Sequence, residues 1–278
     1  MNVFAIGASR NIGYFAALRL LAQGATVTFF LRSPSVFDQD KAIQEFVSSG
    51  KARLVKGDAL NADDVRRGWE TAQNGGTDRV DLLLFTVGGT PSFSITRGIA
   101  ISPRNLCTQS LLNVLSTLPA SLRAPASQPR IVILSSIGLS RASHAALPLL
   151  LKPLYGYLLR GPHADKLAME RVVAYCAWRT WDGDEDELEE GILPEGWREM
   201  EGLPAEGMLE HVVVVRPALL TDGECRAETA GTEPPYRVAD HDLGDGYRVS
   251  RKDVAHFIVE GLLTDWQQWE GKCLSIAY

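Results

Sequence analysis

Short apolar runs alternate with amphipathic stretches along most of the chain. The apolar runs predict strands at Val3 to Ile6, Thr26 to Leu31, Ala52 to Val55, Val80 to Phe85, Arg130 to Leu134, His211 to Val215 and Cys273 to Ile276. The stretches between them predict helices at Ile12 to Ala22, Asp38 to Ser48, Ala62 to Ala72, Pro103 to Leu118, Ala164 to Ala177 and Arg251 to Leu263. Continuous apolar strands that alternate with helices are typical of parallel sheets covered on both faces. We therefore predict an α/β fold, a doubly wound, mostly parallel Rossmann-type sheet with helices on both faces.

Two segments interrupt this alternation within what we interpret as one domain over residues 1–278. The first, from about Thr180 to Gly207, holds ten Asp and Glu residues against one Arg between Asp182 and Glu201. Its glycines and prolines predict an acidic surface insertion that lies outside the cofactor site, as a solvated and partly mobile excursion. The second, at about residues 221–248, is rich in Gly, Pro and Asp and predicts a loop region on the substrate side.

Composition and charge exclude several classes of protein. The net charge of −6 comes from the acidic segment, and the rest of the chain is close to neutral, without the basic stripe of a nucleic-acid-binding protein. No apolar run reaches the roughly 18 residues of a membrane-spanning helix. The four cysteines and five histidines lack metal-like spacing, so we predict no metal site and reduced thiols. These patterns favour a cytoplasmic protein that acts on a small molecule, and they leave its oligomeric state open.

A glycine turn joins the first predicted strand to the first helix. In this position a backbone must turn tightly and approach a pyrophosphate, whose charge meets the amides of the helix N-terminus. Asn11 stands where one common spacing requires glycine, and asparagine tolerates the left-handed conformation better than most residues. The turn predicts dinucleotide binding by Gly7, Ser9, Arg10, Asn11, Ile12 and Gly13.

The second predicted strand ends on Leu31 and Arg32. An NAD site would place Asp or Glu here, against the ribose 2′-hydroxyl. Arg32 can instead pair with a 2′-phosphate, and Arg10 adds a second positive charge. This combination favours NADP(H) over NAD(H).

The segment Gly7-Ala8-Ser9-Arg10-Asn11-Ile12-Gly13 resembles the glycine turn of the short-chain dehydrogenase/reductase superfamily, with one glycine replaced. Other motifs are more similar to its atypical NAD(P)H-binding branch, which includes NmrA-like and biliverdin reductase B-like proteins. The resemblance implies cofactor contacts from the ends of later strands, namely Asp58, Ala59, Val87, Gly88, Gly89, Pro217, Leu219 and Leu220. It also implies a substrate-orienting role for Ser135, which follows the fifth strand.

The catalytic motif of the superfamily is incomplete in this chain. Standard members use Tyr-x-x-x-Lys, whose spacing places the proton-donating tyrosine and the ribose-binding lysine on one helix face. Lys166 matches the lysine, but Pro162 occupies the tyrosine position and cannot transfer a proton. The substitute donors that we consider are His163, Tyr155 and Tyr157. Two acids beside the lysine, Asp165 and Glu170, are expected to pair with bases on the helix surface.

These observations favour an NADPH-dependent reductase of a small carbonyl or conjugated organic substrate. Two alternatives remain open: an NADP(H)-binding or redox-sensing protein without catalysis, and a lyase or isomerase on the same scaffold. The fold alone does not choose among them.

Overall fold

An eight-stranded sheet forms the centre of the molecule. The computed structural model describes residues 1–76, 78–90, 92–94, 98–150, 152, 159–177, 186, 188–231 and 233–278. The strand order is β10-β12-β8-β7-β4-β1-β2-β3. Its strands are β1 (Asn2–Ile6), β2 (Thr26–Leu31), β3 (Ala52–Lys56), β4 (Leu82–Phe85), β7 (Arg130–Leu134), β8 (Val212–Pro217), β10 (Arg237–Ala239) and β12 (Cys273–Ala277). All seven predicted strands are present, with ends shifted by two residues at most.

The strand order places a switch point beside β1. The chain runs outward from β1 through β2 and β3, then returns to add β4, β7, β8 and β12 on the other side. These strands pair in parallel, and only β10 pairs antiparallel, at the outer edge beside β12. In a doubly wound sheet the crevice at such a switch point, beyond the carboxyl ends of the strands, is where ligands bind. The predicted fold is therefore confirmed.

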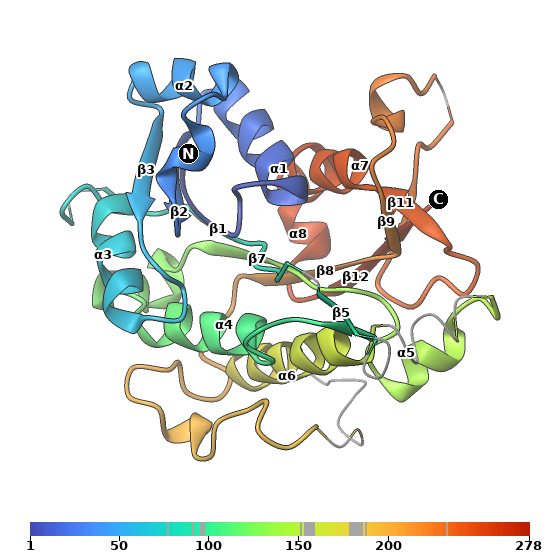
Figure 1. Cartoon of the computed structure of the whole chain (residues 1–278). Helices are drawn as coiled ribbons and strands as arrows, with labels where there is room; N and C mark the ends of the chain where they lie inside the picture. Colours follow the sequence, from blue (N-terminus) through green and yellow to red (C-terminus); the bar gives the residue numbers. More distant parts are fainter. Residues whose placement is uncertain are drawn as a thin grey trace.

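Helices cover both faces of the sheet (Figure 1). One face carries α1 (Asn11–Ala22), α2 (Lys41–Ser48), α7 (Arg251–His256) with its π-helical continuation Phe257–Leu262, and α8 (Trp266–Trp269). The opposite face carries α3 (Ala62–Ala72), α4 (Leu106–Ser116) and α6 (Arg160–Cys176). A hydrophobic core fills each interface, because the strand side chains are apolar on both faces.

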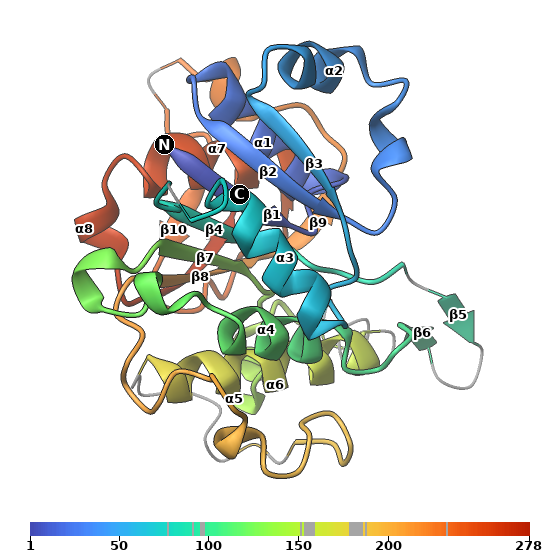
Figure 2. The ribbon, with the colours of Figure 1, turned by 90° about the vertical axis from the view of Figure 1, so that its left-hand side faces the viewer.

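Smaller elements surround this framework. Two short ribbons pair β9 (Leu219–Thr221) with β11 (Arg248–Ser250), and β5 (Ser92–Ser94) with β6 (Gly98–Ala100). Figure 2 shows β5 and β6 projecting beyond the edge where the strands end. Within the described residues the remaining elements are α5 (Arg141–Ala146) and five 3₁₀ turns, Pro34–Phe37, Ala120–Leu122, Pro125–Ser127, Trp197–Glu199 and Arg226–Glu228. None of the helices in the described ranges has the length and apolarity needed to cross a bilayer.

One helix begins earlier than its sequence pattern predicts. The pattern favours a start at Ala164, after Pro162, but α6 begins at Arg160. Proline is tolerated in the first turn of a helix, where its missing N–H would have no intrahelical partner. Pro162 therefore lies inside α6, four residues before Lys166, and the i, i+4 geometry of the family motif is kept although its tyrosine is absent.

The described part of the acidic insertion packs against the body of the protein. Across its described part, Ile192 is buried, and Trp197, Met200 and Leu203 pack against the core beneath α4 and α6. The backbone of Gly207 donates to the carbonyl of Tyr175 near the end of α6. The described residues 188–207 therefore contact the core and α6. None of these residues lines the cavity at the switch point.

The region 221–248 also contains regular structure. Its strand β10 extends the central sheet, and the carboxylate of Asp242 accepts a hydrogen bond from the Ser143 hydroxyl in α5 at 2.7 Å. The described part of this region is therefore tied to the sheet edge and to α5.

Candidate functional site

A cavity of about 500 Å³ opens at the carboxyl ends of β1 to β4. Its floor is the turn after β1, and its walls come from the residues that follow β2, β3 and β4 and from α4. Eight predicted cofactor-binding residues line it together: Gly7, Ser9, Arg10, Arg32, Asp58, Ala59, Val87 and Gly88. Lining residues that the sequence pattern did not single out are Ile6, Phe30, Leu31, Ser33, Val36, Gly57, Thr90, Leu106 and Ser110. The strand ends thus bring distant motifs to one site.

The conformation of the turn explains its residue types. Gly7 has φ of +81°, and a Cβ there would stand 2.5 Å from the Thr86 backbone. At Gly13 a Cβ would stand 2.2 Å from the Thr86 hydroxyl oxygen, so this glycine lets α1 pack closely on the neighbouring strand. Asn11 has φ of +57°, the left-handed conformation that asparagine tolerates. The replaced glycine therefore leaves the turn intact.

The N-terminus of α1 carries no side-chain cap. Its N-cap residue, Arg10, makes no capping hydrogen bond, whereas Asp40, Asn61 and Ser250 cap α2, α3 and α7 through their side chains. The amides of Asn11, Ile12 and Gly13 begin this helix, and the positive end of its dipole faces the glycine turn. A phosphate at this point would satisfy the amides that no side chain caps.

The positively charged side chains that line the cavity can bind an anion at one end of it. Arg10 and Arg32 are both exposed along its lining, and Arg10 donates to the Thr90 hydroxyl at 2.9 Å. Asp58 is the one carboxylate among the described lining residues, and the Leu60 amide donates to it at 3.0 Å. The donor set of two guanidiniums, uncapped amides and hydroxyls fits a phosphorylated dinucleotide.

Several other predicted cofactor residues lie at the same edge of the sheet without lining this cavity. Gly89 follows the lining residue Gly88, and a Cβ there would meet the Ile101 side chain. Pro217 ends β8, and its carbonyl accepts from the Ile137 amide at 3.2 Å, while Leu219 and Leu220 form the start of β9. These three residues lie at the carboxyl edge of the sheet, beside the chain that leaves β7, and do not line the cavity.

Lys166 and Ser135 meet at the end of β7. The Lys166 ammonium donates to the Ser135 carbonyl at 2.8 Å. Burial lowers the pKa of Lys166, and the nearby Cys107, Glu170 and Asp165 oppose that shift. The Ser135 hydroxyl is buried and finds no hydrogen-bond partner among the described residues. A polar atom in that state is a candidate contact for a ligand.

The two acids near Lys166 have structural partners inside the protein, so their predicted pairing with helix-surface bases is wrong. Asp165 accepts from the amides of Cys107 and Thr108, at 2.7 and 2.9 Å, and thereby caps α4. Glu170 accepts from Arg216 of β8, with distances of 2.5 to 3.2 Å. Both members of this second pair are buried, so α6 is held to the sheet by a charged contact.

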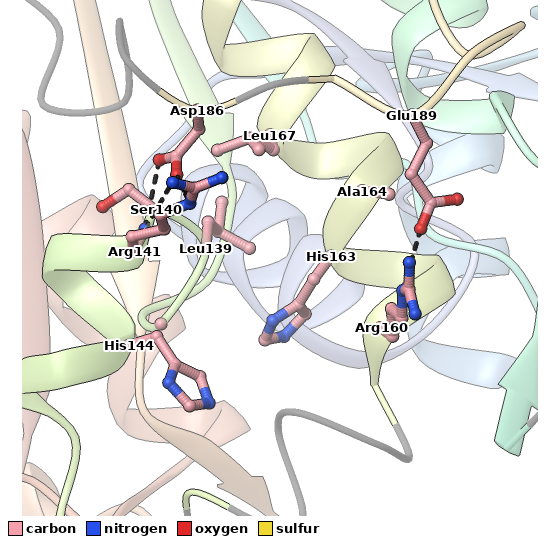
Figure 3. Close-up of a pocket in the computed structure, with 11 residues that line it drawn as sticks. Leu139, Ser140, Arg141, His144, Arg160, His163, Ala164, Leu167, Asp186 and Glu189 are labelled. Atoms are coloured by element: carbon pink, nitrogen blue, oxygen red, sulfur yellow. Dashed lines mark hydrogen bonds and ion pairs between the residues drawn. The ribbon is translucent and has the colours of Figure 1, made fainter.

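A second cavity, of about 490 Å³, lies after β7 (Figure 3). It is lined by the β7–α5 connection, the first turns of α6 and two residues of the acidic insertion: Gly138, Leu139, Ser140, Arg141, His144, Arg160, His163, Ala164, Leu167, Asp186 and Glu189. Figure 3 shows the rings of His144 and His163 directed into the same space. The insertion therefore contributes to a cavity, although to a different one from the cofactor candidate.

His163 is nearly buried, and burial together with the Lys166 charge lowers its pKa to about 3. A hydrogen bond to the Gly138 backbone opposes that shift. The ring is therefore neutral near pH 7, and a neutral imidazole is a much weaker acid than the imidazolium form. Tyr155 and Tyr157, the other predicted donors, lie outside the described residues.

Comparisons with known proteins bear on this arrangement. No protein-family model matches the chain. The reductase pytE of Aspergillus terreus is 27% identical over 245 residues, which cover 86% of this chain and 82% of that protein.

Two solved structures show the same fold. The anaerobillin reductase ChuY of Escherichia coli O157:H7 aligns with a TM-score of 0.56 and 17% identity, over 99% of this chain and 96% of that one. A short-chain dehydrogenase of Bacillus anthracis aligns with a TM-score of 0.59 and 15% identity, over 98% and 93% of the two chains. Together with the strand order and the glycine turn, these relatives confirm the resemblance to the short-chain dehydrogenase/reductase superfamily that the motifs predict.

Proposed function

We propose that the protein is an NADPH-dependent reductase of a small conjugated organic substrate, of the atypical branch of its superfamily. The observation that carries the cofactor assignment is the first cavity, where an uncapped helix N-terminus faces a glycine turn and Arg10 and Arg32 both line the wall. The reductase activity rests on the relatives, since one curated relative and one structural neighbour are reductases.

Arg32 carries the preference for NADPH. It occupies the position where an NAD-binding chain would present a carboxylate to the ribose, and Arg10 stands on the same cavity. A 2′-phosphate would form charge-assisted hydrogen bonds with these guanidiniums, whereas the 2′-hydroxyl of NADH would offer them no anion. The amides of Asn11, Ile12 and Gly13 would hold the pyrophosphate.

The described residues would orient the reactants, and none of them is a strong acid. Hydride chemistry would come from the bound nicotinamide. Lys166, fixed by the Ser135 carbonyl, would hold the ribose, and the Ser135 hydroxyl would orient a substrate oxygen. With Pro162 in place of tyrosine and His163 neutral, the described residues would offer a simple ketone no strong proton donor at neutral pH. Reduction of a conjugated system spreads the negative charge, so solvent can protonate the product afterwards.

Turnover with a substrate panel tests this proposal. NADPH oxidation is followed with quinones, conjugated enones, flavins and saturated ketones, and NADH replaces NADPH in a parallel series. The expected result is turnover of conjugated substrates with NADPH, and slow or absent turnover of saturated ketones. Efficient reduction of saturated ketones would contradict the proposed absence of a dedicated acid.

A second candidate function is NADP(H) binding without redox catalysis. The missing tyrosine at Pro162 and the low pKa of His163 favour it specifically. Tight NADPH binding in calorimetry, combined with no oxidation of NADPH by any conjugated compound of the panel, would select this alternative.

A further inference from the structure

The charged side chains of the second cavity are already paired with one another. The Arg141 amide and guanidinium donate to Asp186, at 3.1 and 3.3 Å, and the Arg160 guanidinium donates to Glu189 at 3.0 Å. Arg104, which precedes α4, forms a third ion pair, also with Glu189. Figure 3 shows the Arg141 and Arg160 contacts along opposite sides of the cavity. Both lining arginines are thus neutralised by carboxylates of the acidic insertion.

The remaining described walls add no Arg or Lys side chain. His163 is neutral because of its burial, and Leu139, Ala164 and Leu167 are apolar. Lys166 lies on α6 but does not line this cavity; its ammonium is bound to the Ser135 carbonyl. An anion that entered would have to compete with Asp186 and Glu189 for the two guanidiniums, and would meet their like charge.

The position of this cavity connects it to the reaction proposed above. Its wall runs from Gly138, shortly after Ser135, to His163, which precedes Lys166 by one helical turn. It therefore borders the part of the site where substrate is expected, on the far side of β7 from the first cavity.

We propose that the second cavity holds the substrate and selects uncharged molecules, and that Asp186 and Glu189 determine this selectivity by neutralising Arg141 and Arg160. This inference rests on the proposed reductase function. Specificity of this kind comes from the unfavourable contact with the wrong substrate as much as from attraction to the right one. The acidic insertion is thereby a specificity element of the substrate side.

Removing one carboxylate charge should weaken the preference for uncharged substrates. Asp186→Asn keeps the size and the hydrogen-bonding capacity of the side chain but leaves the Arg141 guanidinium without its anion. A carboxylate on the substrate can then replace the lost partner through a charge-assisted contact. Glu189→Gln likewise removes the carboxylate that pairs with the guanidiniums of Arg160 and Arg104, so it should also weaken the preference for uncharged substrates.

The experiment uses cinnamaldehyde that bears a para-carboxylate, and its methyl ester. The ratio of kcat/KM for ester over carboxylate is measured with NADPH for the unmodified protein, Asp186→Asn and Glu189→Gln. We expect the unmodified protein to favour the ester by about tenfold or more, and each variant to narrow that ratio by about tenfold. The double variant Asp186→Asn with Arg141→Gln removes the exposed cation and should restore the preference for the ester.

Control measurements distinguish an effect of the lost charge from an effect of misfolding. Asp63→Asn removes a carboxylate that pairs with Arg66 on the surface of α3, away from both cavities, and should leave the ratio unchanged. NADPH affinity, measured by calorimetry, should be equal in all variants, because the insertion does not line the first cavity. A loss of NADPH affinity in one variant marks it as misfolded, and the other variant then carries the test.

The outcome distinguishes this inference from the reductase proposal. Dissociation constants of ester and carboxylate are also measured with NADP⁺ present, so the selectivity is tested even without turnover. Absence of turnover with selective binding of the ester would overturn the reductase function and support the inference. Equal affinity for ester and carboxylate in the unmodified protein, or an unchanged ratio in both folded variants, would overturn the inference.

Discussion

The two cavities are nearly equal in volume, about 500 and 490 Å³, but they are built in different ways. The first is formed by backbone turns that follow four adjacent parallel strands, where glycines permit close approach. The second is formed by side chains from α5, α6 and the acidic insertion, which are held together by ion pairs. The first cavity, the proposed cofactor site, therefore depends on backbone geometry. The second cavity, the proposed substrate site, depends on charge pairing and buried polar contacts.

The largest effect is expected from the buried ion pair that anchors α6. Glu170→Ala removes a carboxylate that pairs with the Arg216 guanidinium, and breaking a buried ion pair costs about 3–5 kcal/mol. Urea unfolding should show this loss of free energy of unfolding, whereas Asp63→Ala, at a surface pair of α3, should cost about 1 kcal/mol or less. Equal losses of stability from the two substitutions would show that the Arg216–Glu170 contact does not anchor α6, which lines the second cavity.

The fold and the first cavity could be predicted because their signals are local. The apolar run Thr26 to Leu31 matches β2 at both ends, since a buried parallel strand is apolar throughout. Gly7 and Asn11 were recognisable because few other residues adopt a positive φ without strain. Arg32 follows β2 directly, so its place at the cavity is fixed by the strand that precedes it.

Backbone geometry at the first cavity can be tested by Gly7→Ala. The added Cβ would stand 2.5 Å from the Thr86 backbone, which cannot move aside without displacing β4. We expect a loss of about 3 kcal/mol in stability and at least a hundredfold weaker NADPH binding. Gly24→Ala is the matched control, because Gly24 has φ of +85° but open space around it. It should cost about 1 kcal/mol and leave NADPH affinity unchanged. Retained NADPH affinity in Gly7→Ala would contradict the proposed pyrophosphate site.

The NADPH preference is expected to depend on one side chain. Arg32→Ala removes a charge-assisted contact to the 2′-phosphate worth about 1.5–3 kcal/mol, which is about tenfold or more in affinity. Calorimetric titration should show weaker NADPH binding and unchanged NADH binding, so that the gap between the two cofactors shrinks. Arg53→Ala, at an exposed base on β3 that pairs with Asp78, should preserve the gap. Equal affinity of the unmodified protein for NADPH and NADH would contradict the assignment of NADPH as the preferred cofactor.

The second cavity could not be predicted, because its residues carry no local signal. Asp186 and Glu189 belong to a run of acids in which nothing in the sequence separates cavity residues from solvent-exposed ones. Asp165 and Glu170 likewise share a helix with surface charges, and only the packing of α6 against α4 and β8 shows that both are buried. The tertiary arrangement, and not the helical spacing, determines which acid meets which base.

The smallest effect on turnover is expected at His163, which lines the second cavity next to Pro162. With its pKa lowered from 6.5 to about 3, the ring stays neutral between pH 6 and 8 and supplies no titrating acid in that range. His163→Asn should therefore slow turnover by less than tenfold and leave the pH profile unchanged there. The free energy of unfolding should depend on pH instead. Below about pH 6.5 this imidazole binds a proton in the unfolded chain but not in the folded protein, so the stability falls as pH falls from 6.5 toward 3. By pH 5 this group should have cost about 2 kcal/mol, and His163→Asn should lose that pH dependence in urea unfolding. A roughly thousandfold drop in turnover, some 4 kcal/mol in the barrier, would instead identify His163 as a general acid and overturn this view of the site.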